Sequence, residues 1–86
     1  MSDIGLIIES LHHAAGRIDE VTELIHRAQG ELDALRERMR RVLADSQSPD
    51  VARAHQISAA TVEHLTTALM ALMTAGQEAR HRASTL

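Results

Sequence analysis

The chain has no cysteine, no aromatic residue and only one proline among its 86 residues. Without cysteine there is no disulfide, no thiolate zinc site and no cysteine nucleophile. Without Phe, Tyr or Trp any core must be aliphatic, and neither base stacking on nucleic acid nor aromatic anchors in an interface are available. Hydrophobic residues still make up 44% of the chain, which is the composition of a folded protein.

Length and charge narrow the class of protein further. Eighty-six residues allow one small domain, and a net charge of −3 disfavours a nucleic-acid partner, because phosphate backbones require a basic surface. The N-terminus carries Asp3 and an apolar run of only three residues, 6–8, which is not the pattern of a signal peptide. The least charged stretch, 64–77, holds three threonines and is too short to cross a bilayer. We therefore expect a cytoplasmic protein that does not insert into a membrane, and export without a cleaved signal peptide stays open.

The clearest pattern is a row of apolar residues that alternate three and four positions apart. A period of about 3.5 residues, sustained over the first half of the chain, predicts a helix whose stripe faces a partner helix along its whole length. We assign residues 3–44 to this helix, which would be roughly 60 Å long at 1.5 Å per residue. The row consists of Ile4, Ile7, Leu11, Ala14, Ile18, Val21, Ile25, Ala28, Leu32, Leu35, Met39 and Val42.

The same segment repeats itself two heptads further on, so that residues 9–21 align with residues 23–35. Each copy holds a Glu-x-x-His pair, Glu9 with His12 and Glu23 with His26, the spacing found in carboxylate-bridged di-iron bundles. Both pairs fall outside the apolar row and are about 21 Å apart along the axis, too far to share one metal. We interpret them as solvated surface groups and expect no cofactor. A metal-binding bundle is the alternative.

The apolar pattern breaks at residues 45–48, before the only proline. Ser48 as N-cap, Pro49 as first helical residue and Asp50 in the first turn predict a second helix over 49–82. So short a connection brings that helix back antiparallel to the first. The sequence therefore predicts an all-α fold, an antiparallel two-helix hairpin with coiled-coil-like packing, in a single domain over 1–86. The second helix should contact the first through His55, Ser58, Val62, Leu65, Leu69, Leu72, Gly76, Ala79 and Ala83.

The second helix carries little charge, and Glu63 is the only formally charged residue between Arg53 and Glu78. Apolar residues fall on most of its faces, more than one partner helix can cover. Small residues four positions apart, from Thr67 to Ala83, would let another helix approach closely. We infer that two hairpins associate into a four-helix bundle with the second helix at its centre, and a monomer with exposed methionines is the alternative. The residues predicted for the interface are Val62, Leu65, Leu69, Met70, Leu72, Met73, Gly76 and Ala79.

Two polar features have more than one interpretation. His55 falls in the contact row, either as a hydrogen-bonded histidine near the hairpin end or as a pH-sensitive switch in assembly. Four arginines, Arg36, Arg38, Arg40 and Arg41, lie in the last turns of the first helix, where positive charge complements the helix dipole. Contact with an anion or an acidic partner is the alternative. No phosphate-binding loop, nucleophile elbow or paired catalytic acid occurs, so we expect neither enzymatic activity nor catalytic residues.

In outline the chain resembles the WXG100-like helical hairpins of actinobacterial specialised secretion. The resemblance rests on a helix-turn-helix chain with its turn near the middle. The turn reads Asp45-Ser46-Gln47-Ser48-Pro49 where that family has Trp-x-Gly, and the chain has no tyrosine for the family's C-terminal export signal. The resemblance implies pairing with a different helical protein. Three hypotheses follow: a homodimeric interaction module, a heterodimeric secretion-type partner, and a metal-binding bundle.

Overall fold

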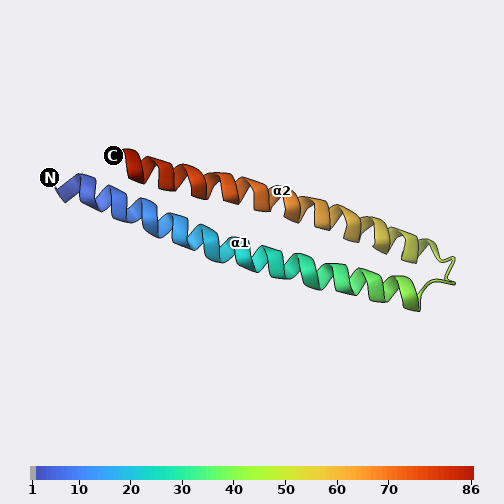
Figure 1. Cartoon of the computed structure of the whole chain (residues 1–86). Coiled ribbons are helices and arrows are strands. Elements are labelled where there is room, and N and C mark those ends of the chain that lie inside the picture. Colours follow the sequence, from blue (N-terminus) through green and yellow to red (C-terminus); the bar gives the residue numbers. More distant parts are fainter. Residues whose placement is uncertain (1) are drawn as a thin grey trace.

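The computed structural model describes residues 2–86 as two long helices joined by a short turn (Figure 1). Helix α1 spans Ser2–Val42 and helix α2 spans Pro49–Thr85. The two run antiparallel, so the start of α1 and the end of α2 lie together, with the turn at the far end. The molecule measures 68 × 15 × 14 Å. The predicted all-α, antiparallel two-helix hairpin is confirmed.

The start of α2 forms as the local sequence predicts. Ser48 has extended backbone angles, φ −63° and ψ 131°, and its hydroxyl oxygen accepts a hydrogen bond from the Asp50 backbone N–H at 3.2 Å. This bond satisfies one of the amide groups that have no partner within the helix. Pro49 needs no such partner, because it has no N–H to satisfy. The predicted N-cap is confirmed.

The other helix ends differ slightly from the predicted bounds. Helix α1 stops at Val42 rather than at residue 44, because the Ser46 N–H bonds to the Leu43 carbonyl at 3.0 Å and closes a turn there. Helix α2 continues three residues beyond the predicted end at residue 82. No Gly or Pro follows to stop it, and the Leu86 N–H still bonds to the Arg82 carbonyl at 3.2 Å.

The contact between the helices, which we call the seam, alternates three and four residues apart on both helices. On α2 it follows the predicted positions from His55 to Ala83. On α1 seven of the twelve predicted positions are wrong, because they are exposed. The other five are shielded as predicted, and they are Leu11, Ile18, Ile25, Leu32 and Met39. Residues one position further along the chain take the places of the exposed ones from Ile7 onward. They are Ile8, Ala15, Thr22, Gln29, Arg36 and Leu43.

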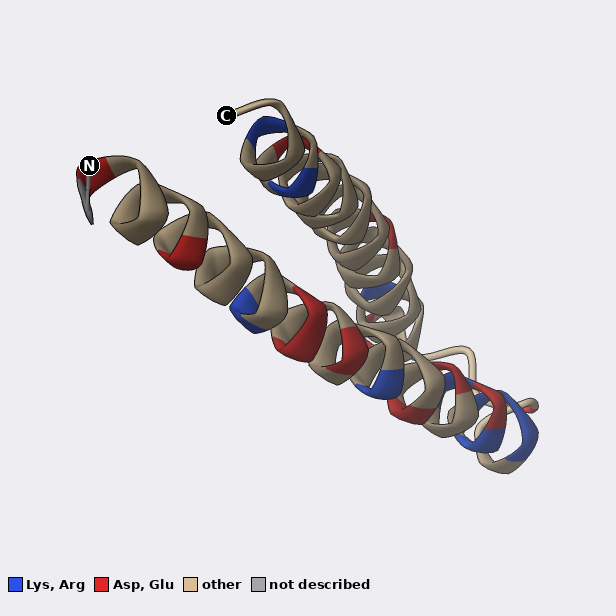
Figure 2. Cartoon of the chain, turned by 60° about the vertical axis from the view of Figure 1, so that its left-hand side comes forward, with Lys and Arg blue, Asp and Glu red and all other residues tan. Residues whose placement is uncertain are grey.

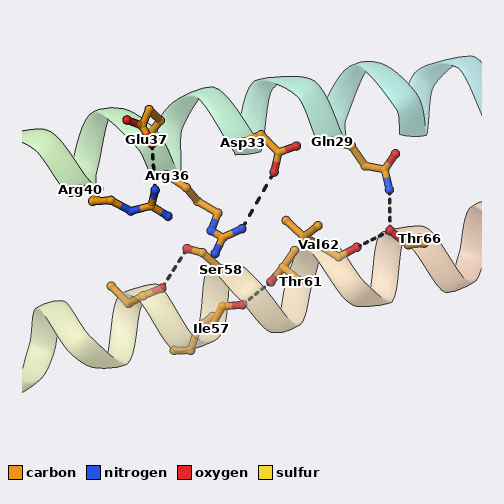
Figure 3. A network of polar contacts seen from close by, with 11 residues as sticks. Gln29, Asp33, Arg36, Glu37, Arg40, Ile57, Ser58, Thr61, Val62 and Thr66 are labelled. Carbon is orange, nitrogen blue, oxygen red and sulfur yellow. Dashed lines mark hydrogen bonds and ion pairs between the residues drawn. The ribbon is translucent and has the colours of Figure 1, made fainter.

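Polar matching near the turn gives a physical reason for this seam. The Gln29 side-chain amide donates a hydrogen bond to the Thr66 hydroxyl at 3.0 Å, across the two helices. About two turns closer to the connection, Arg36 extends toward α2 beside Ser58 (Figure 3). The Ser58 and Thr66 hydroxyls also donate to backbone carbonyls of α2, so the bond from Gln29 is the polar contact that favours this seam. A seam built on Ala28 and Leu35 instead would lack it.

The interior that this seam encloses is thin. The only buried hydrophobic residues in the described chain are Ala15, Leu69 and Ala83, and none of the large side chains is fully buried. The helices approach closely at Gly76, where an added Cβ would lie 3.3 Å from the Ile18 Cγ2 atom. Neither helix contains an apolar stretch of the kind required to span a bilayer. The hairpin is thus held by one narrow line of small and aliphatic contacts.

Candidate interaction surface

An apolar row lies along α1 beside the seam, and we call it the outer row. Its members are seven residues apart, which places them on one line along a helix. All are exposed, including Leu35 at 50% and Val42 at 75%. The sequence assigned these residues to the contact with the second helix, but α2 does not cover them. The outer row consists of Ile7, Ala14, Val21, Ala28, Leu35 and Val42.

The seam has a polar side and an apolar side. On the polar side Arg80 forms an ion pair with Asp19, and Gln29 bonds to Thr66. The outer row lies on the opposite side of α1. Val21, for example, comes directly before the seam residue Thr22, whereas Asp19 comes directly after the seam residue Ile18. Helix α2 flanks this apolar side with mostly small residues. They are Ala54, Thr61, Ala68, Ala75 and Arg82.

Charged residues are more frequent on α1 than on α2 (Figure 2), and those of α1 are all exposed except Arg36. They pair along that helix, as in Arg17 with Glu20 at 2.9 Å and Arg40 with Glu37 at 3.0 Å, and these side chains are more than half exposed. Exposed pairs of this kind stabilise a protein by about 0.2–1 kcal/mol at most. Among the ion pairs of residues 2–86, only that of Arg80 joins the two helices. Electrostatics therefore contributes little to holding the hairpin closed.

The residues predicted for the interface divide into two groups. Met70 is 64% exposed and Met73 is 48% exposed, so both are available to another molecule. The other six are partly or fully buried and lie in the seam against α1. They are Val62, Leu65, Leu69, Leu72, Gly76 and Ala79. Most of the residues predicted to contact a second chain therefore pack between the two helices of the same hairpin.

The Glu-x-x-His pairs lie in solvent. Glu9, His12, Glu23 and His26 are all exposed, as expected from their positions outside the apolar row. In the part of the chain that the structure describes, no three His, Asp or Glu side chains converge in a way that could hold a metal ion. The pairs thus have the solvated placement that the sequence predicts.

The arginine cluster separates into one inward and three outward side chains. Arg38, Arg40 and Arg41 are exposed, whereas Arg36 lies in the seam and its side chain is 26% exposed. The Arg36 Nε atom is buried without a hydrogen-bond partner among residues 2–86, and an Nη atom is 4.0 Å from an Asp33 carboxylate oxygen (Figure 3). A buried N–H without a partner is costly, so this arginine weakens the seam.

His55 is half-buried in the seam, as its position in the contact row predicts. It lines a shallow groove beside the turn, together with Arg40, Leu43 and Val51. Its imidazole makes no hydrogen bond to any of residues 2–86. A role as a pH-sensitive switch in assembly stays a prediction.

Sequence reasoning missed the outer row as a separate surface, although a signal for it was present. Leu11 is followed by an apolar residue both three and four positions later, Ala14 and Ala15. Ile18 is likewise followed by Val21 and then by Thr22, which a seam tolerates. Two overlapping rows are therefore available on α1, and one helix can cover only one of them.

Comparison of the chain with protein-family models, with curated proteins and with solved structures finds no match.

Proposed function

We propose that this chain is a non-enzymatic assembly module that works as a homodimer, two hairpins forming a four-helix bundle. The observation that carries the proposal is that the outer row is exposed while very few side chains are buried between the two helices. Large hydrophobic side chains such as Val21, Leu35 and Val42 are exposed, while the buried hydrophobic residues of the described chain are two alanines and one leucine. Contiguous exposed apolar surface of this extent marks an interaction site.

The energetics of so small a chain favour the same conclusion. Two helices alone seldom bury enough apolar surface to offset the conformational entropy of about 1–2 kcal/mol per ordered backbone residue. Covering a large aliphatic side chain contributes about 1.5–3 kcal/mol. A second hairpin over the apolar side would cover several such side chains at once, and it would create the core that a single hairpin lacks.

The charged side of α1 then remains on the outside of the bundle. Its exposed ion pairs, including Arg40 with Glu37, keep that face solvated and available for further contacts. We expect the module to work in the cytoplasm, consistent with a chain that contains no cysteine.

Substitution within the outer row tests this proposal against a matched control. We expect Leu35→Glu to give a mass of 9.4 kDa by light scattering after size exclusion, at concentrations where the wild type has twice that mass. A carboxylate within the apolar outer row would be buried without a partner in the dimer. The control Ala34→Glu adds the same charge at the neighbouring, outward position and should leave the dimer intact.

Two outcomes would contradict the homodimer. One is a wild-type protein that is monomeric at all concentrations, which would favour a different helical partner, as the WXG100-like resemblance implies. The other is equal loss of the dimer in Leu35→Glu and Ala34→Glu, which would show that added charge and not the outer row decides association.

A further inference from the structure

The twelve-membered apolar row of α1 combines the outer row with the five shielded seam residues between its members and with Ile4. Because its spacing alternates three and four and begins and ends with a step of three, the row reads the same in both directions. A helix with such a row can pack against a second copy of itself in the antiparallel direction with every position matched. The row is therefore compatible with a second copy in the antiparallel direction, and the charges beside it bear on the register.

We propose that α1 of one hairpin packs antiparallel against α1 of a second copy, with the two-fold axis passing near Glu23 and the two turns at opposite ends. This inference rests on the proposed homodimer and specifies its geometry. In this register every residue of the twelve-membered row meets an apolar residue of the partner's row. The pairs are Ile4 with the partner's Val42, Ile7 with the partner's Met39, Leu11 with the partner's Leu35, Ala14 with the partner's Leu32, Ile18 with the partner's Ala28, and Val21 with the partner's Ile25.

Charges at the edge of the apolar row fit the same register. Arg17, Leu24 and Glu31 are seven residues apart and lie next to the outer row, on the side away from the seam. All three are exposed, Leu24 at 58%. Antiparallel packing about an axis near Glu23 places Leu24 beside the partner's Leu24. It also places Arg17 beside the partner's Glu31, twice in each dimer, so opposite charges meet on either side of the two-fold axis.

The contact along α2 is compatible with this arrangement. When α1 lies on the partner's α1, the apolar side of α2 faces the partner's α2. Its members there are mostly small, including Ala68 and Ala75, so two such helices can approach closely. The face available measures up to 68 by 15 Å, enough for the roughly 800 Å² per partner that a standard interface buries.

The opposite arrangement, with both turns at the same end, fits less well. It would lay the outer row of α1 on the partner's α2, whose flanking row contains Thr61 and Arg82. Arg82 lies on this side of α2 in either arrangement and pairs with Glu78 of its own helix at 3.8 Å, so it does not decide between them. Placing both turns at the same end gives up the self-matched row of α1 and the pairing of Arg17 with the partner's Glu31. The observations therefore favour turns at opposite ends.

A distance between the two turns decides the geometry. The chain has no cysteine, so Gln47→Cys accepts a single nitroxide label at an exposed position in the turn, away from every contact proposed above. We expect double electron–electron resonance on deuterated protein to give a label separation of roughly 70 Å, from 24 residues on either side of the axis at 1.5 Å each. A separation below about 30 Å would overturn the register and leave the dimer standing. No dipolar interaction at all would contradict the dimer itself.

Charge reversal provides a second, independent test of the pairing. We expect Arg17→Glu to raise the dimer dissociation constant about three- to ten-fold, since two edge pairs are lost per dimer. The double variant Arg17→Glu with Glu31→Arg should restore it to within about two-fold. Arg27→Glu changes the same charge on the solvent face of α1 and should have little effect. A double variant as weak as Arg17→Glu alone would overturn the antiparallel register.

Discussion

At the scale of single residues, the side chain of Arg36 destabilises the seam in which it lies. Arg36 occupies a position where an aliphatic residue would pack against α2, and its Nε atom is buried without a partner among the described residues. Among residues 2–86 the acidic side chain within ion-pair distance of Arg36 is that of Asp33, which is 4.0 Å away and mostly exposed. Attraction to it therefore offsets little of the free-energy cost of removing the guanidinium group from water. The contact between the helices is weaker near the turn for this reason.

Replacing that arginine should stabilise the protein. We expect Arg36→Leu to raise the free energy of unfolding by about 1 kcal/mol, because it removes a buried N–H without a partner and adds apolar contact. Urea denaturation at one fixed protein concentration measures it. Arg41→Leu, at a position 74% exposed, should change stability by less than about 0.5 kcal/mol. A loss of stability in Arg36→Leu would mean that the guanidinium group has a favourable role in the seam.

Gly76, unlike Arg36, favours the seam, because the helices approach too closely there to leave room for a side chain. A valine there would drive its Cβ to 3.3 Å from the Ile18 Cγ2 atom and add two further methyl groups. We expect Gly76→Val to lower the free energy of unfolding by about 1–3 kcal/mol. Gly30→Val is the control, since nothing lies within 4 Å of a Cβ there and valine favours a helix over glycine by a few tenths of a kcal/mol. Equal effects of the two substitutions would show that backbone propensity and not close packing decides.

At the scale of the elements, local signals predicted the helices and the turn well. Ser48, Pro49 and Asp50 determine the start of α2 through short-range hydrogen bonding and a fixed φ, which need no tertiary information. The regular apolar spacing of α1 also predicted one uninterrupted helix, as found.

Which side of α1 faces α2 could not be predicted from apolar spacing alone. Leu11 and its equivalents belong to both overlapping rows, and the choice depends on long-range polar contacts such as that of Gln29 with Thr66. The outer row of α1 was missed as a candidate surface for the same reason. The sequence emphasised Met70 and Met73 on α2, whereas the more continuous exposed row, represented by Leu35, runs along α1.

The cap of α2 makes a prediction at this scale. We expect Ser48→Ala to lower the free energy of unfolding by about 1 kcal/mol, because the Asp50 amide loses its hydrogen-bond acceptor. Ser48→Asp keeps an acceptor at the same place and adds a favourable charge at the helix N-terminus, so it should retain full stability. Thermal unfolding followed by circular dichroism measures both. A neutral Ser48→Ala would show that Pro49 alone is sufficient to start the helix.

At the scale of the whole molecule, the chain is a rod with one narrow seam and a long uncovered apolar side. Exposed ion pairs along α1 add little to its stability, and Arg80 with Asp19 is the only ion pair across the helices within residues 2–86. The twelve-membered row of α1 supplies a surface that matches its own reverse. A second copy can therefore complete the core that the single hairpin lacks, and self-association is the central claim.

The mass of the wild-type, untagged protein in solution tests that claim most directly. Sedimentation equilibrium over a hundred-fold dilution should give twice the chain mass of 9.4 kDa at high concentration, with helicity falling as the dimer dissociates, because folding and association are linked. A mass of 9.4 kDa at every concentration, with the helical content unchanged, would contradict the account. The uncovered side of α1 would then not be a surface for a second copy.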